Sequence, residues 1–530
     1  MTFFARRAEG TALVAAFAIR LFIAWAPMDW LLRTILGDDP FYYFTIARNV
    51  GRGHGFTFDT IAPTDGFHPL WMIVIWPVFK FVQDPALAIH AALTVSALCD
   101  VAALALLCSI LRNLDIHPGV AAFLVALYAI SPILISSSGP MNGLETALNL
   151  AVTFAFLSLY RRALVGPTRT VATTVLFGVS SGILFLARTD NIILLGFTHA
   201  FLLWRQSSDR ARIRHHIGAV LVASVVAAPW LLWVCLKFGS PVQVSGLAVA
   251  YFMRAFVGAQ GWTGLDYGIK FLRNLGTVTT YFPVYHRNID SFTAAASGDV
   301  IVTLALAGGT LFFYRTDSLE GQRALLKRLA PWGAPVLAGG VFVFVHTLRA
   351  VDLRGWYYAS LLPASYLLFG IAGDYVVSRG AVAPRWTKTC LLMTGTGVLI
   401  LMFTFSLRAG FSRRCGEIDG YNMIRAVNDA LPDDVLLGSW NAGLFGYFYE
   451  KGNVVNLDGS ANNGVYDSIK SRSLGEYVTR EHIGYLLDAA GAMELVKPYW
   501  NGSGGVSFPE PVLENSAIAQ CRRIRLVPVP

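Results

Sequence analysis

Residues 86–111 read ALAIHAALTVSALCDVAALALLCSIL, and His90 and Asp100 are the only ionisable side chains there besides cysteine. A membrane-spanning helix needs about 20 consecutive, mainly apolar residues, so this stretch is long enough to cross a bilayer. The pattern predicts an all-α polytopic membrane domain with about eleven spans. The other apolar runs, several of them shorter, are 11–32, 119–138, 145–160, 171–187, 190–204, 217–236, 299–314, 332–348, 357–377 and 388–407.

The composition indicates the same class of protein. Charged residues make up 14% of the 530 residues, whereas soluble domains contain about 25%. Hydrophobic residues make up 55%, and the mean hydropathy is +0.53. These values exclude an ordinary soluble enzyme, a disordered chain, a collagen-like repeat and a coiled coil. Six cysteines are too few for a disulfide scaffold of this length.

The net charge of +9 is unevenly distributed. From Arg408 onward there are 12 Lys and Arg against 14 Asp and Glu, whereas the preceding residues hold 30 against 19. This contrast predicts a membrane domain, residues 1–407, followed by a small water-facing domain, residues 408–530. Positive charge in the first part belongs to loops at a membrane surface, and no pattern typical of nucleic-acid binding is present.

Short basic connectors predict the orientation, because cytoplasmic loops are enriched in Lys and Arg. Placing all of them in the cytoplasm is consistent with eleven spans and puts residues 408–530 outside. Residues 68–82 (HPLWMIVIWPVFKFV) are apolar but short and contain Pro77, so we interpret them as a re-entrant or interfacial helix. The basic segments are 6–7, 161–169, 205–214, 315–328 and 379–388.

The water-facing part is predicted to be a small α/β domain. Residues 420–431 have helical spacing, and 435–440 and 453–459 have the composition of buried strands. The segment between these strands is a turn or short helix, and a further helix and strand are expected within 464–489.

The most unusual segment is the first external loop, residues 37–71 (GDDPFYYFTIARNVGRGHGFTFDTIAPTDGFHPLW). Asp38 and Asp39 directly follow the first span, and ionisable groups at a membrane boundary are functional candidates. One aspartate can accept a proton from an acceptor hydroxyl as general base. The pair is also a candidate site for a divalent cation, Mg²⁺ or Mn²⁺. The structural alternative is a helix N-cap before Pro40.

The same loop contains two histidines, His54 among glycines and His68 before a proline. A lone histidine is usually a hydrogen-bonded structural residue. Two of them beside two aspartates make both candidates for substrate binding.

The loop and three later segments resemble the GT-C superfamily of glycosyltransferases. The resemblance rests on DD, FYYF, ARN, GHGF and GFHPLW in this order, followed by 136–148 (SSSGPMNGLETAL), 352–363 (DLRGWYYASLLP) and 439–459 (SWNAGLFGYFYEKGNVVNLDG). GT-C enzymes are polytopic proteins that take a sugar from a polyprenyl-phosphate carrier. They include protein O-mannosyltransferases, lipid A aminoarabinose transferases and cell-wall arabinosyltransferases.

The resemblance implies a GT-C-like fold and inverting transfer of a sugar from a polyprenyl-phosphate donor to an extracytoplasmic glycan, lipid or protein. It assigns the acid/base role to Asp38 or Asp39, and favours Asp38 as the first acidic residue of the pattern. It also implies a bacterial cytoplasmic membrane, with the active site and residues 408–530 outside. It does not identify the sugar.

Four residues near the predicted loop at 349–356 are further candidates for binding the donor. Guanidinium groups match phosphate oxygens bidentately, so Arg349 and Arg354 are candidates for the donor phosphate. The alternative for Arg354 is pairing with Asp352 or with lipid head groups. Tyr357 and Tyr358 can stack on a sugar or belong to an interfacial aromatic belt.

Four more candidates lie at ends of predicted elements. Glu145 either caps a helix or lines the cavity. Arg188 and Asp190 either pair with each other or contribute to a phosphate pocket. Asp458 follows a predicted strand, where it either binds ligand or forms an Asp-Gly turn.

The alternative function class is a transporter or lipid flippase. Such a protein would place functional charges near the bilayer midplane on broken helices, whereas here they gather at the outer boundary. The sequence has no GxGxxG, Walker A, HExxH or CxxC motif. No basic loop is long enough for a nucleotide-sugar domain, which favours a lipid-linked donor.

Cys415 and Cys521 stand at the two ends of the predicted external domain, whereas the other cysteines lie in apolar runs. In an oxidising compartment these two are expected to form a disulfide, since domain termini often lie close together. Two free thiols are the alternative.

Overall fold

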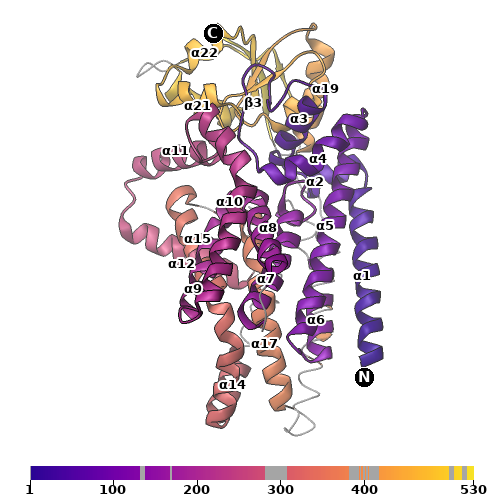
Figure 1. Cartoon of the computed structure of the whole chain (residues 1–530). Helices are drawn as coiled ribbons and strands as arrows, with labels where there is room; N and C mark the ends of the chain where they lie inside the picture. The colour runs from indigo at the N-terminus through magenta and orange to yellow at the C-terminus, as the bar shows by residue number, and fades with distance from the viewer. Residues whose placement is uncertain are drawn as a thin grey trace.

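The computed structural model describes residues 2–131, 138–166, 170–280, 307–351, 353–380, 417–500, 506–515 and 522–530, with single helical residues between 393 and 404. Most of the helices run side by side as an elongated body, and a domain containing a β-sheet sits at one end (Figure 1). The N-terminus lies at the opposite end of this body, and the C-terminus lies in the sheet domain (Figure 1).

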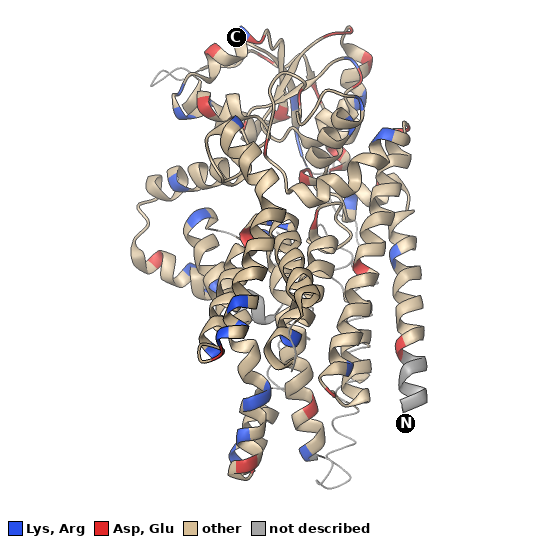
Figure 2. Cartoon of the chain, in the orientation of Figure 1, with Lys and Arg blue, Asp and Glu red and all other residues tan. Residues whose placement is uncertain are grey.

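The helical body is built from apolar helices of different lengths and from one shorter, charged helix, Leu319–Leu329. Along most of their length they carry few charges, and Lys and Arg gather toward the end remote from the sheet domain (Figure 2). The helices are α1 (Thr2–Ala24), α5 (Pro85–Asn113), α6 (Pro118–Ala129), α7 (Thr146–Val165), α8 (Val171–Ala187), α9 (Ile192–Arg205), α10 (Arg210–Phe238), α14 (Leu319–Leu329), α15 (Gly333–Ala350) and α17 (Leu362–Gly380).

Small residues let some of these helices approach closely. Gly178 and Gly182 of α8 face Val222 and Val226 of α10, and an added Cβ at either glycine would come within 2.6 Å of a valine side chain. Packing through small residues is typical of membrane helices, because van der Waals contact replaces the hydrophobic effect in lipid.

Five helical segments are long and apolar enough to cross a membrane, or six with the bent pair α1 and α2 (Met28–Thr34). The protein is therefore an integral membrane protein, but the predicted count of eleven spans is not confirmed. The predicted span 11–32 is broken, because α1 and α2 meet at 104°, with Pro27 directly before α2. Several other predicted spans form shorter helices, and 388–407 lies almost entirely outside the described residues.

The remaining described helices of the first 380 residues are short or lie near the sheet domain. Residues 68–82, interpreted as a short inserted helix, form the 13-residue helix α4 with Pro77 inside it. The elements are α3 (Asp39–Gly51), α4 (Pro69–Phe81), η2 (Thr189–Asn191), α11 (Val244–Ala259), α12 (Gly264–Thr280), η3 (Ala330–Trp332), α16 (Gly355–Tyr358) and η4 (Ala359–Leu361).

The C-terminal part is α/β, as predicted, and all strands named here fall after residue 408. The five-stranded sheet has the order β2-β1-β3-β5-β4. β1 pairs in parallel with β2 and β3, whereas β5 is antiparallel to β3 and β4. The elements are α19 (Ile418–Ala430), β1 (Leu437–Ser439), α20 (Gly443–Phe448), β2 (Val454–Asn456), α21 (Asn463–Lys470), α22 (Leu474–Arg480), β3 (Tyr485–Ala489), α23 (Ala490–Val496), η5 (Lys497–Tyr499), β4 (Leu513–Glu514) and β5 (Ile524–Pro528).

One apolar core continues from the helical body into this domain. The ring of Phe44 in α3 stacks on Phe79 in α4 at 5.2 Å, and Phe41 lies 5.7 Å from Tyr447 in α20. All four residues belong to the same buried cluster. The sheet domain is therefore packed onto the first external loop, which carries Asp38 and Asp39.

Candidate active site

The N-terminus of α20 is bound by Asp38. Asp38 Oδ1 accepts a hydrogen bond from the Leu444 N–H at 2.7 Å, and Oδ2 accepts one from the Gly443 N–H at 3.2 Å. The first N–H groups of a helix have no partner within it and carry partial positive charge, so a carboxylate there is stabilising. Gly443 permits this approach, because a Cβ there would clash with the Asp38 carbonyl oxygen.

The C-terminal end of α20 is bound by Arg48, from the last turn of α3. Its guanidinium donates to the carbonyl oxygens of Tyr447 at 2.8 Å and Gly446 at 3.0 Å. A cation is favourable at this end of a helix. Asp38 and Arg48 therefore hold α20 at both ends with the signs that its dipole favours.

Asp38 and Asp39 have different surroundings. Burial raises the pKa of Asp38 well above its usual range, and the charge of Glu417 raises it further, while the Leu444 N–H opposes both. Asp39 is open to solvent yet lies among enough protein atoms that desolvation raises its pKa; Arg354 lowers it, and Glu145 raises it. Asp38 thus stabilises the junction between the helical body and the sheet domain, whereas Asp39 interacts with charged residues of the helical body.

Asp458 and Tyr42 lie beside the two aspartates. The Tyr42 hydroxyl accepts a hydrogen bond from the Ala442 N–H at 2.9 Å. Burial raises the pKa of Asp458 to about 6; bonds from Ser460 oppose the shift, and the charge of Asp39 adds to it. Asp458 also accepts the Ser460 N–H at 2.7 Å, so it forms the predicted turn and lies at the site as well.

Arg188 is enclosed by two carboxylates at the C-terminal end of α8. Its Nη1 donates to Glu145 Oε1 at 2.6 Å, while Nε and Nη2 donate to the two oxygens of Asp190 at 3.1 and 2.7 Å. Arg188 is 1% exposed. Burial alone would raise the pKa of Asp190, but Arg188 and then His346 hold it well below its usual range. The Arg188 charge is therefore satisfied within the protein.

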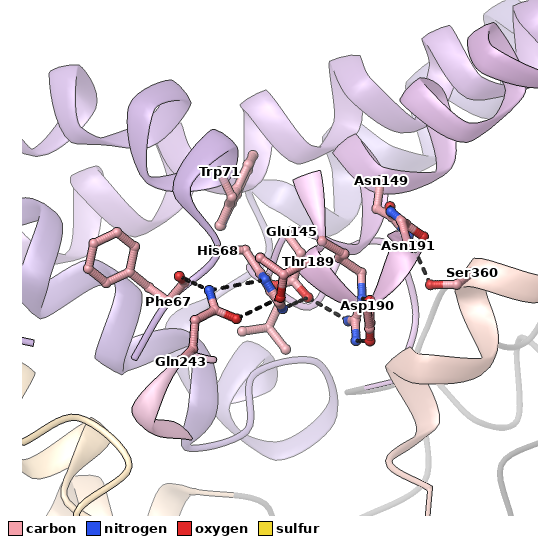
Figure 3. A network of polar contacts seen from close by, with 12 residues as sticks. Phe67, His68, Trp71, Glu145, Asn149, Thr189, Asp190, Asn191, Gln243 and Ser360 are labelled. Carbon is pink, nitrogen blue, oxygen red and sulfur yellow. Dashed lines mark hydrogen bonds and ion pairs between the residues drawn. The ribbon is translucent and has the colours of Figure 1, made fainter. Parts of the chain in front are cut away.

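A second chain of polar contacts joins this cluster to the first external loop (Figure 3). Gln243 Nε2 donates to the Phe67 carbonyl oxygen and lies 3.4 Å from His68 Nδ1, and Gln243 Oε1 accepts the Thr189 hydroxyl at 2.9 Å. His68 Nε2 is 3.8 Å from Glu145 Oε1. Burial lowers the pKa of His68, although Glu145 opposes this. His68 is thus a neutral member of the network.

Aromatic rings cover the Arg188 cluster. The Arg188 guanidinium lies 4.8 Å from the centre of the Tyr357 ring, in cation–π contact. His346 lies 4.8 Å from the same ring, and its Nε2 is 3.3 Å from Asp190 Oδ2. α16 therefore brings Tyr357 onto the arginine and places Arg354, directly before it, near Asp39.

Most of the candidates from the sequence meet in this region. Linked contacts and charge interactions connect Asp38, Asp39, His68, Glu145, Arg188, Asp190, Arg354, Tyr357 and Asp458. The others lie elsewhere. His54 is in the exposed turn after α3, Arg349 donates to the Gly246 carbonyl oxygen at 3.1 Å, and Tyr358 is buried in an apolar cluster. Asp352, Cys415 and Cys521 lie outside the described residues.

Sequence reasoning missed several residues that build the site. Tyr42 and Arg48 stand in the loop that was singled out, but their partners are distant in the chain. His346 lies near the end of the predicted run 332–348, so a polar residue near the end of a predicted span was the available signal there. Gln243 lies between predicted spans, directly before α11, and had no such signal.

The predicted divalent-cation site at Asp38 and Asp39 stays a prediction. Among the described residues, no group of three or more His, Cys, Asp or Glu side chains is placed to hold a metal ion. Both oxygens of Asp38 already accept backbone N–H groups, so a cation would compete with the junction to α20.

Comparisons with known proteins give a match in structure alone. No protein-family model matches the chain, and no curated protein matches it significantly. The chain is similar to the crystal structure of ArnT from Cupriavidus metallidurans bound to undecaprenyl phosphate, with a TM-score of 0.57 and 14% identity over 99% of this chain and 98% of that one. The apo ArnT structure gives a TM-score of 0.56 with the same identity and coverage. The chain therefore has the fold of ArnT along almost its whole length, which confirms the GT-C resemblance at the level of the fold.

Proposed function

We propose that this protein is a membrane glycosyltransferase that transfers a sugar from a polyprenyl-phosphate donor to an acceptor hydroxyl at the outer membrane face. One observation carries the proposal: a solvent-accessible carboxylate, Asp39, lies within electrostatic reach of the Arg354 guanidinium. Transfer from a lipid phosphate requires a base and a cation that can bind the phosphate in the same site. The ArnT fold, seen with undecaprenyl phosphate bound, supports the donor class.

In the proposed reaction, Asp39 accepts the proton of the acceptor hydroxyl. The resulting oxygen attacks the anomeric carbon from the side opposite the phosphate. The bond from that carbon to the phosphate oxygen breaks, and polyprenyl phosphate leaves with the electron pair. The configuration at the anomeric carbon inverts, and positioned base catalysis contributes about 10²–10⁴-fold.

The donor phosphate is assigned to Arg354 rather than to Arg188. Arg188 already donates to Glu145 and Asp190 and is almost fully buried. Arg354 is exposed, and its charge lowers the pKa of Asp39. The same guanidinium can therefore neutralise the leaving phosphate and keep the base ionised.

Asp38 is assigned a positioning role, in contrast to the preference derived from the sequence pattern. Its oxygens accept two backbone N–H groups of α20. Through these bonds it fixes the sheet domain over Asp39, the next residue along the chain.

The flippase alternative predicts functional charges deep in the membrane. The described helices contain one such pair, in which Arg20 Nε donates to Asp100 Oδ2 at 2.6 Å with both side chains fully buried. Tyr128 donates to the other Asp100 oxygen. The hydrogen bonds among these three side chains satisfy most of their polar atoms. This favours a structural role in which they hold α1, α5 and α6 together.

The test compares Asp39→Asn with Asp38→Asn in cells that lack the native protein. Extracted lipids are analysed by mass spectrometry for polyprenyl-phosphate sugars. We expect the donor to accumulate in the Asp39→Asn cells as it does without the protein, while purified Asp39→Asn still binds undecaprenyl phosphate. Normal donor levels with Asp39→Asn and accumulation with Asp38→Asn would transfer the base role to Asp38. Normal levels with both would contradict the enzymatic proposal.

A further inference from the structure

Asp65 joins three parts of the chain that are far apart in sequence. It lies in the first external loop, and its Oδ1 accepts the Val244 N–H at the start of α11 (3.2 Å) and Nδ2 of Asn463, the first residue of α21 (3.0 Å). Asp65 is 1% exposed. The packing is close, because a methyl group at Gly66 would clash with the Ser460 carbonyl oxygen.

Each member of the Asp65–Asn463 pair has one oxygen left over. Asp65 Oδ2 and Asn463 Oδ1 are both buried, and neither has a hydrogen-bond partner in the described part of the chain. Buried acceptors are rarely left without a donor, because they lose the hydrogen bonds of water and gain none in return. The two unsatisfied atoms belong to side chains that are already joined by the Nδ2–H···Oδ1 bond.

A single proton satisfies both oxygens. A protonated carboxyl has one O–H donor and keeps an acceptor oxygen, and a primary amide offers the complementary N–H and C=O. Such an acid and amide pair through two parallel hydrogen bonds. The first of these, from Asn463 to Asp65, is present, and the second requires a proton on Asp65 Oδ2.

We propose that Asp65 is a proton-operated latch, in which the protonated carboxyl donates from Oδ2 to Asn463 Oδ1 and ties the first external loop and α11 to the C-terminal domain. Ionisation of Asp65 releases that proton to solvent and removes this one hydrogen bond, which leaves both oxygens without a donor. The latch is independent of the glycosyl-transfer chemistry.

The surroundings of Asp65 favour its protonated form. Burial is the largest cause that raises the pKa of Asp65, and the N–H bonds from Asn463 and Val244 oppose it. Asp467 and Lys470 of α21 pair with each other at 2.7 Å, and α11 carries no charge before Arg254. The charged or titratable side chains on the segments around Asp65 are Arg52, His54, Asp59 and His68 of the loop, Tyr251 and Arg254 of α11, and Asp458, Tyr466, Asp467 and Lys470 of the C-terminal domain.

The sign of the pH effect follows from the raised pKa. The folded protein binds this proton more tightly than the unfolded chain, so the contribution of Asp65 to stability is fully present below the unfolded pKa. It is lost as the pH rises through the folded pKa. The latch is therefore closed in acid and weakened at higher pH.

Asp65→Asn tests the latch, because its amide presents an N–H where the protonated carboxyl presents an O–H. This variant keeps the latch closed at every pH. Asp59→Asn is the matched control on the same loop. Both oxygens of Asp59 accept hydrogen bonds, from the Ile61 and Ala62 N–H groups and from Asn462 Nδ2. Replacing one of these oxygens with the amide NH₂ group of asparagine would therefore set an N–H against another donor. Asn463→Leu removes the acceptor for the latch proton.

The measurement is amide hydrogen exchange of residues 244–252 in the intact protein in detergent, with variants compared at the same pH. At pH 8 we expect exchange in Asp65→Asn to be slower than in the wild type by about fivefold, the effect of one hydrogen bond. In measurements at successively lower pH the difference should shrink as the pH passes through the folded Asp65 pKa, while Asp59→Asn and Asn463→Leu should exchange faster at every pH. A water or cation bridging the two oxygens would keep Asp65 ionised. It would give a constant difference between Asp65→Asn and the wild type across the whole series, and would overturn the proposal.

Discussion

Asp38 and Leu444 are 406 residues apart in the chain, and the Leu444 N–H donates to Asp38 Oδ1 at 2.7 Å. This bond places the sheet domain directly on the residue that precedes Asp39. The candidate site is therefore formed by both domains. Its geometry depends on a junction in which one helix, α20, is held by opposite charges at its two ends.

Removing the Asp38 carboxylate is expected to loosen that junction. Asp38→Ala leaves the Gly443 and Leu444 N–H groups without their acceptor and should lower stability by about 1–2 kcal/mol. Thermal unfolding of the purified protein measures the change. Asp38→Asn keeps one acceptor oxygen and should lose less. Equal unfolding temperatures for all three proteins would contradict a role for Asp38 in the junction.

The pH dependence of transfer should report Asp39. A base must be ionised to act, so activity should rise with pH through the Asp39 pKa, which burial raises above that of an ordinary aspartate. Arg354 lowers this pKa and Glu145 raises it. Arg354→Gln should therefore move the acidic limb to higher pH, and Glu145→Gln should move it to lower pH. If the acidic limb of the pH profile lies at the same pH in the wild type, Arg354→Gln and Glu145→Gln, the titrating group is not Asp39.

Arg354 should hold the donor through its planar fork. Arg354→Lys retains the charge but loses bidentate geometry, so its affinity for undecaprenyl phosphate should fall about tenfold, an expected loss of about 1.4 kcal/mol. Arg349→Lys is the control, since Arg349 donates to the Gly246 carbonyl oxygen and should tolerate the change. Binding can be followed by titrating the lipid into purified protein. A loss confined to Arg349→Lys would place the phosphate there instead.

Arg188 should matter for stability more than any other arginine of the site. Arg188→Met leaves Glu145 and Asp190 buried without their cation and should cost about 3–5 kcal/mol. Arg212→Met is the control. It breaks the Arg212–Asp209 ion pair (3.1 Å), in which the two side chains are 33% and 45% exposed, and such surface pairs contribute little to stability. Similar losses of stability in the two variants would show that burial does not govern the Arg188 cluster.

The predicted external placement of residues 408–530 has a chemical consequence that can be tested. A Cys415–Cys521 disulfide should appear as a cross-linked peptide in a non-reducing tryptic digest, because an oxidising compartment allows the pair to form. Both cysteines lie outside the described residues. Alkylation of both thiols in protein purified without reductant would contradict the disulfide and weaken the external assignment.

The sequence by itself determined the class of protein, the α/β character of the C-terminal part and the loop that carries the site. These features depend on local composition and periodicity, which are visible in any window of the chain. Residues 420–431 and 435–440 were located as a helix and a strand for this reason, and α19 and β1 lie there. Asp38 and Asp39 were found because charge is rare at a membrane boundary.

Only the tertiary structure shows how the surroundings of those residues differ. Asp38 and Asp39 are adjacent and chemically identical, so spacing could not rank them. Their difference comes from the Leu444 N–H on one side and Arg354 on the other. Likewise, Arg188 was a candidate phosphate ligand until Glu145, 43 residues away, proved to occupy its guanidinium. Electrostatic environment depends on distances through space, and a linear sequence does not contain them.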